Sequence, residues 1–402
     1  MKEPKRPLGL YIHIPFCKSK CIYCDFYSLP EREGRMDAYA KALCSHLKEA
    51  APRAQGHSVD SVYFGGGTPS YLGASRLCAI LKVIRKHYGV TKDAEITLEA
   101  NPDSADSYKD LRALRRCGFN RISLGMQSAD DAELRAIGRV HTMDQVRTAV
   151  ENARKARFPD VSLDLIYGLP GQTMERWQEN LSAAAALDPD HLSCYGLKVE
   201  EGTPLYQAKD RLALPGDDLQ ADMYLYTVEF LQHMGYRQYE ISNFARPGHE
   251  SRHNLKYWTL QEYAGFGPGA HSDFGGVRYA YGRDLEGYIQ GVLTGSPMVS
   301  ESERIPLTER DTEYIMLRLR TALGLDVREF ERTFRRRFDP LEPLMRRFAQ
   351  AGYALEEDGR WHLTPTGYLV SNQIIGALLE ALAADKARRA SAREQGDFRV
   401  EH

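Results

Sequence analysis

Residues 9–26, GLYIHIPFCKSKCIYCDF, decide how the rest of the chain is interpreted. The β-rich run 9–14 predicts a short strand, and Cys17, Cys21 and Cys24 follow it within eight residues. A structural zinc site needs four closed ligands, usually from two cysteine pairs, and the sequence contains no second pair. Three thiolates instead suit an iron–sulfur cubane whose fourth iron stays open to an exchangeable ligand. The spacing therefore predicts a [4Fe–4S] cluster on these three cysteines.

The bulk composition excludes several classes of protein. Seven cysteines in 402 residues, four of them scattered, do not make a disulfide framework. With 53 basic and 55 acidic residues the net charge is -2, so we expect no nucleic-acid partner. No apolar run approaches the roughly 18 residues that span a bilayer, and the N-terminus has no signal-peptide pattern. The sequence predicts a soluble, cytoplasmic protein.

Short β-rich runs alternate with amphipathic helical segments as far as about residue 200. The predicted strands are 9–14, 61–66, 94–100, 121–127, 161–168 and 191–197. The predicted helices between them are 35–50, 74–88, 104–116, 143–157 and 173–187. This alternation predicts an α/β fold with a parallel sheet, as in a partial (β/α)6 TIM-like barrel. A doubly wound open sheet gives the same pattern, and periodicity alone does not separate the two.

Unusual residues gather where the predicted strands end. The cysteines follow the first strand and Gly65-Gly66-Gly67-Thr68-Pro69 follows the second. Glu99 ends the third, Gln127 ends the fourth, and Asp164 to Pro170 belong to the fifth. Because ligand sites of parallel α/β folds lie at the carboxyl ends of the strands, these loops predict one shared site.

The chain divides into a core over 1–235, a connecting segment over 236–304, and a C-terminal domain over 305–385. Helices over 308–321, 326–337 and 340–350, a hairpin over 353–364 and a last helix over 365–384 predict a small winged-helix-like domain. Residues 386–402 are polar, and we expect this tail to be disordered.

The cysteine motif CxxxCxxC after a first strand, with Tyr23 before the third cysteine, resembles the radical S-adenosylmethionine (SAM) superfamily. The resemblance implies that the open iron chelates the amino and carboxylate groups of SAM, and that cluster reduction yields a 5′-deoxyadenosyl radical. The GGGTP loop resembles the superfamily loop whose backbone contacts the SAM amino group.

Further strings resemble the oxygen-independent coproporphyrinogen III oxidase family. They are YIHIPFC (11–17), LEANP (98–102), LGMQS (124–128), IGRVH (137–141) and LDLIYGLPGQ (163–172). Carried over residue by residue, the resemblance assigns SAM contacts to Tyr11, Tyr23, Gly66, Gly67, Thr68, Glu99, Gln127, Arg139 and Asp164. Carboxylates at strand ends can accept from ammonium or ribose hydroxyls, and Arg139 can pair with a carboxylate.

That family holds oxidases and haem chaperones, and the sequence departs from the oxidases. The oxidases have a further cysteine two residues after the third, where this chain has Phe26, and an N-terminal extension before the first strand. The string HNxxYW at 253–258 resembles the haem chaperones and implies haem contact by His253, Asn254, Tyr257 and Trp258. His253 is the expected axial ligand and Tyr257 the second candidate.

Two functions therefore stand. The first is a haem chaperone that binds the cluster, SAM and haem and passes haem to acceptor proteins. It implies homodimer formation and peripheral contact with membrane-bound acceptors. The second is an enzyme that decarboxylates porphyrinogen propionates to vinyl groups, for which His13 matches a substrate-side position. HNxxYW favours the chaperone, and we expect the aromatic segment 264–282 to line the same pocket.

Overall fold

The computed structural model describes residues 5–296 and 299–397, which form two compact units. The first unit contains residues up to 237 together with 242–256 and 261–304. The second contains 238–241, 257–260 and the chain from 305 onward. The segment 236–304, which the sequence predicts as a separate connector, is therefore divided between the two units.

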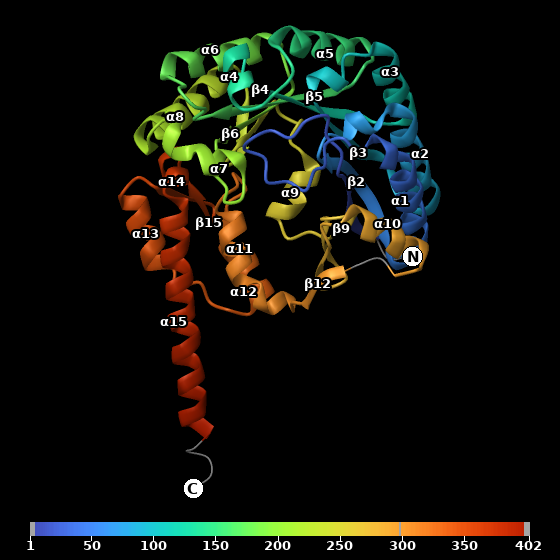
Figure 1. The fold of residues 1–402 in the computed structure, drawn as a ribbon. Coiled ribbons are helices and arrows are strands. Elements are labelled where there is room, and N and C mark those ends of the chain that lie inside the picture. The colour runs from blue at the N-terminus through green and yellow to red at the C-terminus, as the bar shows by residue number, and fades with distance from the viewer. Residues whose placement is uncertain (1–4, 297–298, 398–402) are drawn as a thin grey trace. The chain divides into compact units, whose positions relative to one another are not determined.

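All six predicted strands are present in the first unit and run parallel to one another. They are β1 (Arg6–Ile14), β2 (His57–Gly66), β3 (Val90–Ala100), β4 (Arg121–Gln127), β5 (Asp160–Tyr167) and β6 (His191–Gly196). Their order in the sheet is the order of the chain, without the reversal that defines a doubly wound sheet. The fold is therefore a partial (β/α)6 barrel (Figure 1).

The six strands do not close into a ring. The second neighbour of β1 is β9 (Tyr263–Phe266), and the second neighbour of β6 is β8 (Asn243–Ala245). Beyond β9 the sheet continues antiparallel through β10 (His271–Phe274), β11 (Val277–Tyr281) and the exposed β12 (Val299–Arg304). These strands belong to the segment that the sequence predicts as a connector.

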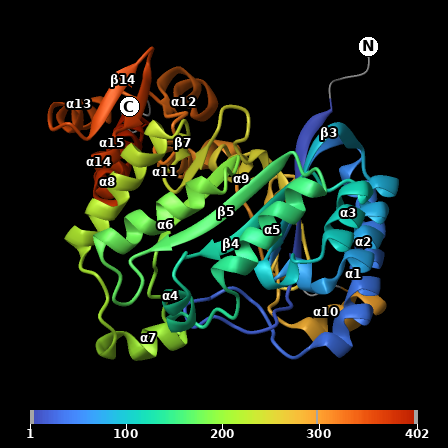
Figure 2. The same ribbon diagram turned by 90° about the horizontal axis from the view of Figure 1, so that it is seen from above.

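Most helices of the first unit cover the outer side of the sheet, whereas α4 and α7 lie at one end of the barrel (Figures 1 and 2). They are α1 (Met36–Ala50), α2 (Ala74–His87), α3 (Tyr108–Cys117), α4 (Asp131–Ala136), α5 (Met143–Lys155), α6 (Met174–Ala186), α7 (Pro204–Ala208), α8 (Asp217–His233) and α10 (Leu285–Leu293). Short 3-10 helices lie at Glu33–Arg35, Ala51–Ala54, Pro69–Leu72, Pro102–Ser104 and Lys209–Arg211. Caps end several helices as expected, for example Gly118 after α3, with a φ of 122°.

Side chains alternate between the two faces of the barrel strands. In β1 the outward residues Leu8, Leu10, Ile12 and Ile14 are fully buried in the core between the sheet and the helices. Each such side chain contributes roughly 1.5–3 kcal/mol. The residues between them face the barrel interior, and in the six strands they are mostly polar. A core outside the ring and polar groups inside it leave room for a ligand.

The second unit contains the three predicted helices and the hairpin, together with a third strand, β13, and two final helices where the sequence predicts one. They are α11 (Asp311–Arg318), β13 (Leu325–Asp326), α12 (Val327–Phe334), α13 (Glu342–Gln350), β14 (Ala354–Glu357), β15 (Arg360–Leu363), α14 (Pro365–Leu369) and α15 (Ser371–Asp397). The 3-10 helix Leu307–Glu309 precedes α11, and the sheet order is β13-β15-β14. Two elements, β7 (Arg237–Glu240) and α9 (Arg252–Trp258), contain residues of both units.

Helix α15 continues to Asp397, through residues 386–397 of the predicted tail. The first part of α15 buries Ile374, Leu378 and Leu382. Lys386 then pairs with the fully buried Asp311 at 2.8 Å. Residues rich in Ala, Arg, Lys and Glu have high helix propensity and extend such an anchored helix readily. The last five residues of the predicted tail lie outside the described part of the chain.

Candidate functional site

A cavity of about 590 Å³ occupies the interior of the barrel and opens at the carboxyl ends of the strands. It is lined by eleven of the twelve residues predicted to hold the cluster and SAM. They are Cys17, Cys21, Cys24, Tyr23, Gly66, Gly67, Thr68, Glu99, Gln127, Arg139 and Asp164. The exception is Tyr11. The fold thus gathers residues from six separate loops and strands into one site.

The cysteine loop follows β1 and is fixed by backbone hydrogen bonds. The Cys17 N–H donates to Leu29 O at 3.2 Å, and the Leu29 N–H donates to Pro15 O at 2.8 Å. Cys17 and Cys21 are buried and Cys24 is partly exposed. Burial raises the pKa of the Cys17 and Cys24 thiols. The loop therefore presents three thiols to one end of the cavity.

The glycine loop lies against the cysteine loop and requires its glycines. Gly66 has a φ of 114°, and a Cβ there would lie 2.6 Å from the His13 ring. A Cβ on Gly67 would lie 2.7 Å from Phe16 O and 3.1 Å from Cys17 Sγ. No L side chain fits at either position without displacement. The bare backbone is what lets this loop approach the cysteines.

Glu99 is the carboxylate at the end of β3, and its neighbours hold it in place. Tyr63 Oη donates to Glu99 Oε1 at 2.7 Å, and the Gly66 N–H donates to Oε2 at 3.2 Å. Burial raises the pKa of Glu99 from 4.5 to about 7. A bound ammonium group would restore the ionised form, because an opposite charge favours it. Glu99 therefore suits the amino group of an amino-acid ligand.

Arg139 connects the loops on the other side of the cavity. Its Nη1 donates to Asn101 Oδ1 at 3.0 Å and its Nη2 donates to Gly125 O at 2.8 Å. Nη1 also lies 3.7 Å from Cys21 Sγ. Gln127, at the end of β4, has a φ of 64°, a strained conformation that turns its side chain into the cavity lining. Within the described part of the chain, buried Gln127 Oε1 and Arg139 Nε have no hydrogen-bond partner.

Asp164 lies deeper in the barrel and is held by serines of the adjacent strands. Ser193 Oγ donates to its Oδ1 at 2.7 Å, and Ser123 Oγ donates to the same oxygen at 3.0 Å. Burial raises the pKa of Asp164. The donor set of the cavity fits a cluster with SAM: three thiols at one end, two carboxyls for an ammonium and ribose hydroxyls, and two orphaned buried atoms.

Tyr11 and His13 lie behind this lining. Tyr11 Oη and His13 Nδ1 are 3.1 Å apart, and His13 Nε2 is 2.9 Å from Tyr27 O. Burial lowers the pKa of His13 to about 4, so the ring is neutral. It packs directly under Gly66. In this conformation both residues support the glycine loop and do not line the cavity.

The four residues of the HNxxYW segment that were predicted to contact haem lie in different environments. His253 is completely buried: its Nδ1 is 2.9 Å from Ser61 Oγ, and its ring stacks on Tyr63 with centroids 5.2 Å apart. Burial lowers the pKa of His253 to about 3. Of the four predicted haem contacts, only Asn254 lines the cavity. Tyr257 and Trp258 are partly exposed and belong to the second unit.

The segment 264–282 does not line the cavity. It forms β9, β10 and β11, which lie beyond β1 in the sheet. Several of its aromatic residues, such as Phe266, Phe274 and Tyr281, pack into the core, and its place in a haem pocket stays a prediction.

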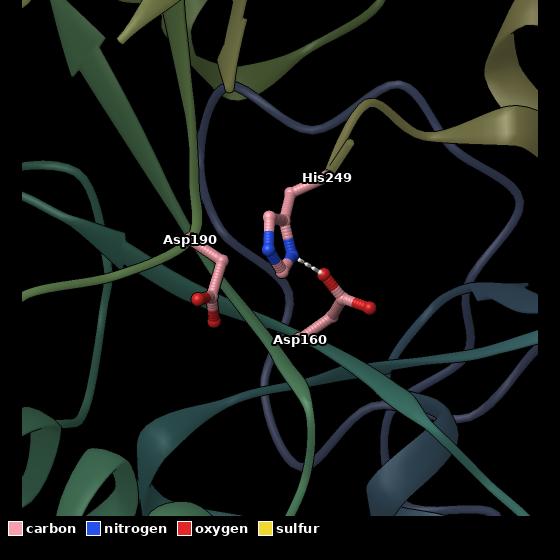
Figure 3. A group of neighbouring side chains, drawn as sticks. All are labelled: Asp160, Asp190 and His249. Atoms are coloured by element: carbon pink, nitrogen blue, oxygen red, sulfur yellow. Dashed lines mark hydrogen bonds and ion pairs between the residues drawn. The ribbon is translucent and has the colours of Figure 1, made fainter. Parts of the chain in front are cut away.

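Asp160, Asp190 and His249 come together at the amino-terminal ends of β5 and β6, away from the mouth of the cavity (Figure 3). His249 Nδ1 bonds Asp160 Oδ1. Asp190 accepts from Arg154 Nη1 and from the Val161 N–H, both at 2.8 Å. Arg121 lies 3.9 Å from Asp160. Nearby arginines neutralise both carboxylates, so the group lacks the negative charge that a cation site needs. Its contacts instead connect the amino-terminal ends of β5 and β6.

Several lining residues escaped the sequence analysis. Tyr63, Asn101, Ser123 and Ser193 each hold a predicted ligand residue by a hydrogen bond. The available signal was the period-two alternation of each strand, which places Tyr63 on the same face as Gly65 and Ser123 on the same face as Gln127. Counting back in steps of two from the predicted ligand residue at the end of a strand identifies the residues that support it.

Comparison with known proteins agrees with this geometry. The model of the radical SAM superfamily matches residues 11–184, and that of the HemN C-terminal domain matches 305–370. The Escherichia coli coproporphyrinogen III oxidase (HemN), a radical SAM enzyme, superposes with a TM-score of 0.82 at 26% identity, covering 94% of this chain and 91% of that one. The fold and the site thus define a radical SAM protein.

The relatives narrow this class to one family. Heme chaperone HemW of Bacillus subtilis is 35% identical over 92% of this chain and 99% of its own. Heme chaperone HemW of Mycobacterium tuberculosis is 36% identical, with 94% and 96% covered. That of Escherichia coli is 35% identical, with 93% and 98% covered. The chain belongs to the HemW family.

Proposed function

We propose that this protein is a cytoplasmic haem chaperone that binds a [4Fe–4S] cluster, SAM and haem and transfers haem to acceptor proteins. One observation carries the proposal: the alignments with relatives named as heme chaperones cover almost the full length of this chain and of each relative. Such coverage includes the barrel, the HNxxYW segment and the C-terminal unit. No helix among the described residues is long and apolar enough to cross a bilayer.

Cys17, Cys21 and Cys24 would hold the cluster, and the cavity beside them would hold SAM. The cluster and SAM together supply one-electron chemistry when bound. Glu99 would accept the ammonium group, and Gly66 and Gly67 would bring backbone groups close to it. Arg139 keeps a nitrogen for a carboxylate, and Asp164 is placed for hydroxyl groups. Tyr23 and Gln127 complete the lining.

Haem would contact the HNxxYW segment. Asn254 already faces the cavity, and Tyr257 is partly exposed. Axial ligation by His253 requires the segment to open, because the imidazole bonds Ser61 and has no exposed surface. Tyr257 needs no such opening and is the alternative ligand. Homodimer formation and peripheral contact with membrane-bound acceptors complete the proposal.

Two observations favour a second function. The SAM cavity and the likeness to coproporphyrinogen III oxidase fit oxidative decarboxylation of a porphyrinogen. Against it stands Phe26, which follows the third cysteine by two residues and is 62% exposed at the cavity lining. A phenylalanine offers no thiol at that position, so the chaperone is the better supported function.

The deciding experiment is an anaerobic haem titration of the cluster-reconstituted protein. A saturable Soret change near one haem per chain is expected, and it should weaken in Tyr257→Phe or His253→Ala. His233→Ala is the matched control, because this exposed histidine bonds only its own helix. An unchanged spectrum in His253→Ala would assign that residue to the core. Absence of saturable binding, with turnover of coproporphyrinogen III, would replace the chaperone by the enzyme.

A further inference from the structure

Two cysteines outside the cavity meet on the outer face of the barrel. Cys78 lies on α2 and Cys117 is the last residue of α3, 39 positions later. The two helices pack side by side. Cys117 Sγ donates to Cys78 O at 3.6 Å, which brings the two cysteines together, and Cys78 Sγ donates to Ala113 O at 3.9 Å. Both cysteines are partly exposed, so small molecules can reach them.

The charges around the pair favour a thiolate on Cys117. Lys82 stands one turn after Cys78 on α2, and Arg85 follows on the same helix. The Arg85 guanidinium covers Gly118, where a Cβ would lie 2.3 Å from Nη2. The hydrogen bond from Cys78 lowers the pKa of Cys117 to about 7, and both cations act in the same direction. The same hydrogen bond raises the pKa of Cys78, so the two thiols are chemically distinct.

The remaining cysteines outside the cluster loop have no such arrangement. Burial raises the pKa of Cys44 on α1, with only Lys48 opposing it. Cys194 in β6 is almost fully buried, beside the charge of Asp164. Reactive cysteines occur in electropositive, partly exposed surroundings, whereas buried ones are inert. Among these four, only the 78–117 pair meets that description.

We propose that Cys78 and Cys117 form a dithiol site that reacts with low-molecular-weight disulfides. The Cys117 thiolate attacks one sulfur of the disulfide RSSR, forming a mixed disulfide and releasing RS⁻, which takes a proton. The Cys78 thiol then loses its proton and attacks the Cys117 sulfur, releasing the second RSH. In total two protein thiols are oxidised, RSSR is reduced to two RSH, and α2 becomes linked to α3. The site is independent of the haem function.

The test uses the cluster-reconstituted protein, incubated anaerobically with oxidised glutathione. Free thiols are then alkylated under denaturing conditions, and the tryptic peptides are analysed without reduction. We expect a disulfide between peptides 77–82 (LCAILK) and 117–121 (CGFNR). In Cys78→Ser this link should be absent, and glutathione should remain on Cys117. Absence of the link and of any adduct in the unsubstituted protein, or a link to Cys44, would overturn the proposal.

Alkylation rates provide a second readout that a purely structural role would not change. At pH 7 Cys117 should react roughly tenfold faster than Cys44, because more of it is thiolate. Cys78→Ala removes the donor and should slow Cys117, whereas Cys78→Ser retains a donor and should preserve most of the rate. Equal rates in these two variants would contradict the hydrogen-bonded thiolate. Cluster absorbance, which should not change, confirms that each variant is folded.

Discussion

The two ends of the barrel interior are both polar, but their polar groups are used differently. At the base, Glu95 accepts from the backbone N–H groups of Arg252 and His253, at 2.8 and 3.0 Å. Lys256 Nζ pairs with Asp60 at 2.8 Å, and Asp160 pairs with His249 (Figure 3). Toward the mouth, Glu99 and the deeper Asp164 have raised pKa values, and Gln127 Oε1 and Arg139 Nε have no hydrogen-bond partner among the described residues.

This difference separates structure from function along the same strands. Gly9, Ser61 and Glu95 stand side by side in register and receive the start of α9. A Cβ on Gly9 would lie 2.9 Å from the Lys256 side chain, so this glycine makes room for α9. Buried polar groups normally find partners, and those that lack them in the protein are suited to a ligand. The polar groups at the base hold the barrel together, whereas those at the mouth are available to bind a ligand.

The largest effect is expected at the mouth, from Cys21→Ser. Removing one of three thiolates should abolish [4Fe–4S] assembly, because a hydroxyl is a poor replacement for a thiolate on iron. Iron and sulfide content and the visible charge-transfer absorbance measure the loss. Cys44→Ser is the matched control and should assemble a full cluster. A normal cluster in Cys21→Ser would mean that the ligand assignment is incorrect.

The next largest effect is expected from Gly66→Ala. The new Cβ would be 2.6 Å from the His13 ring, at a φ of 114°. The loop must move, which should weaken SAM binding by at least about tenfold, or about 1.4 kcal/mol. Gly275→Ala is the control, since it has a φ of 66° but no atom within 4 Å of its Cβ. Equilibrium dialysis of both variants should show a loss only for position 66; similar affinities would refute the crowding argument.

Lys256→Met tests the base. It leaves Asp60 without its cation, which should lower the free energy of unfolding by about 1–3 kcal/mol. Asp60 keeps a third of its surface exposed, so water limits the loss. Chemical denaturation measures it, with Lys155→Met in the exposed pair with Glu151 as a near-neutral control. SAM affinity should be unchanged. If SAM affinity fell together with the free energy of unfolding, the base would not be structurally separate from the ligand site.

The smallest effect concerns the pH dependence of stability. The folded pKa of Glu99, about 7, lies above its ordinary value of 4.5. Its stabilising protonated form is therefore lost as pH rises through this range, and the free energy of unfolding should fall by about 1–2 kcal/mol. This figure allows for water in the cavity that the side chain faces. Glu99→Gln should flatten the curve between pH 4.5 and 7. An equally steep curve in that variant would assign the dependence to other groups.

The sequence predicted the strands and the ligand-bearing loops because both have strong local signals. Each of the six strands was found, with starts up to four residues late, as for β2 and β3. The cysteine spacing and the GGGTP loop are compact motifs whose chemistry can be inferred without the fold. All but Tyr11 of the residues assigned to cluster and SAM line one cavity.

What remained hidden depends on contacts between residues distant in sequence. A histidine such as His253 can be a haem ligand, but here it is buried against Ser61 and Tyr63, which lie 192 and 190 positions away in the sequence. The order of strands, which separates a barrel from a doubly wound sheet, is a property of pairing and not of periodicity. The ion pair of Lys386 in α15 joins it to Asp311, 75 positions earlier, whose burial the polar tail does not reveal.

The unclosed ring has a consequence for the dimensions of what can enter. An eight-stranded closed barrel has an interior that side chains fill, so its ligands bind above it. Here β1 continues to β9 and β6 to β8, and the strand ladder between β1 and β6 is absent within the described residues. A lateral seam of this kind sets no fixed diameter. The width of the barrel interior is therefore set by the loops and strands on either side of the missing ladder and not by a closed ring.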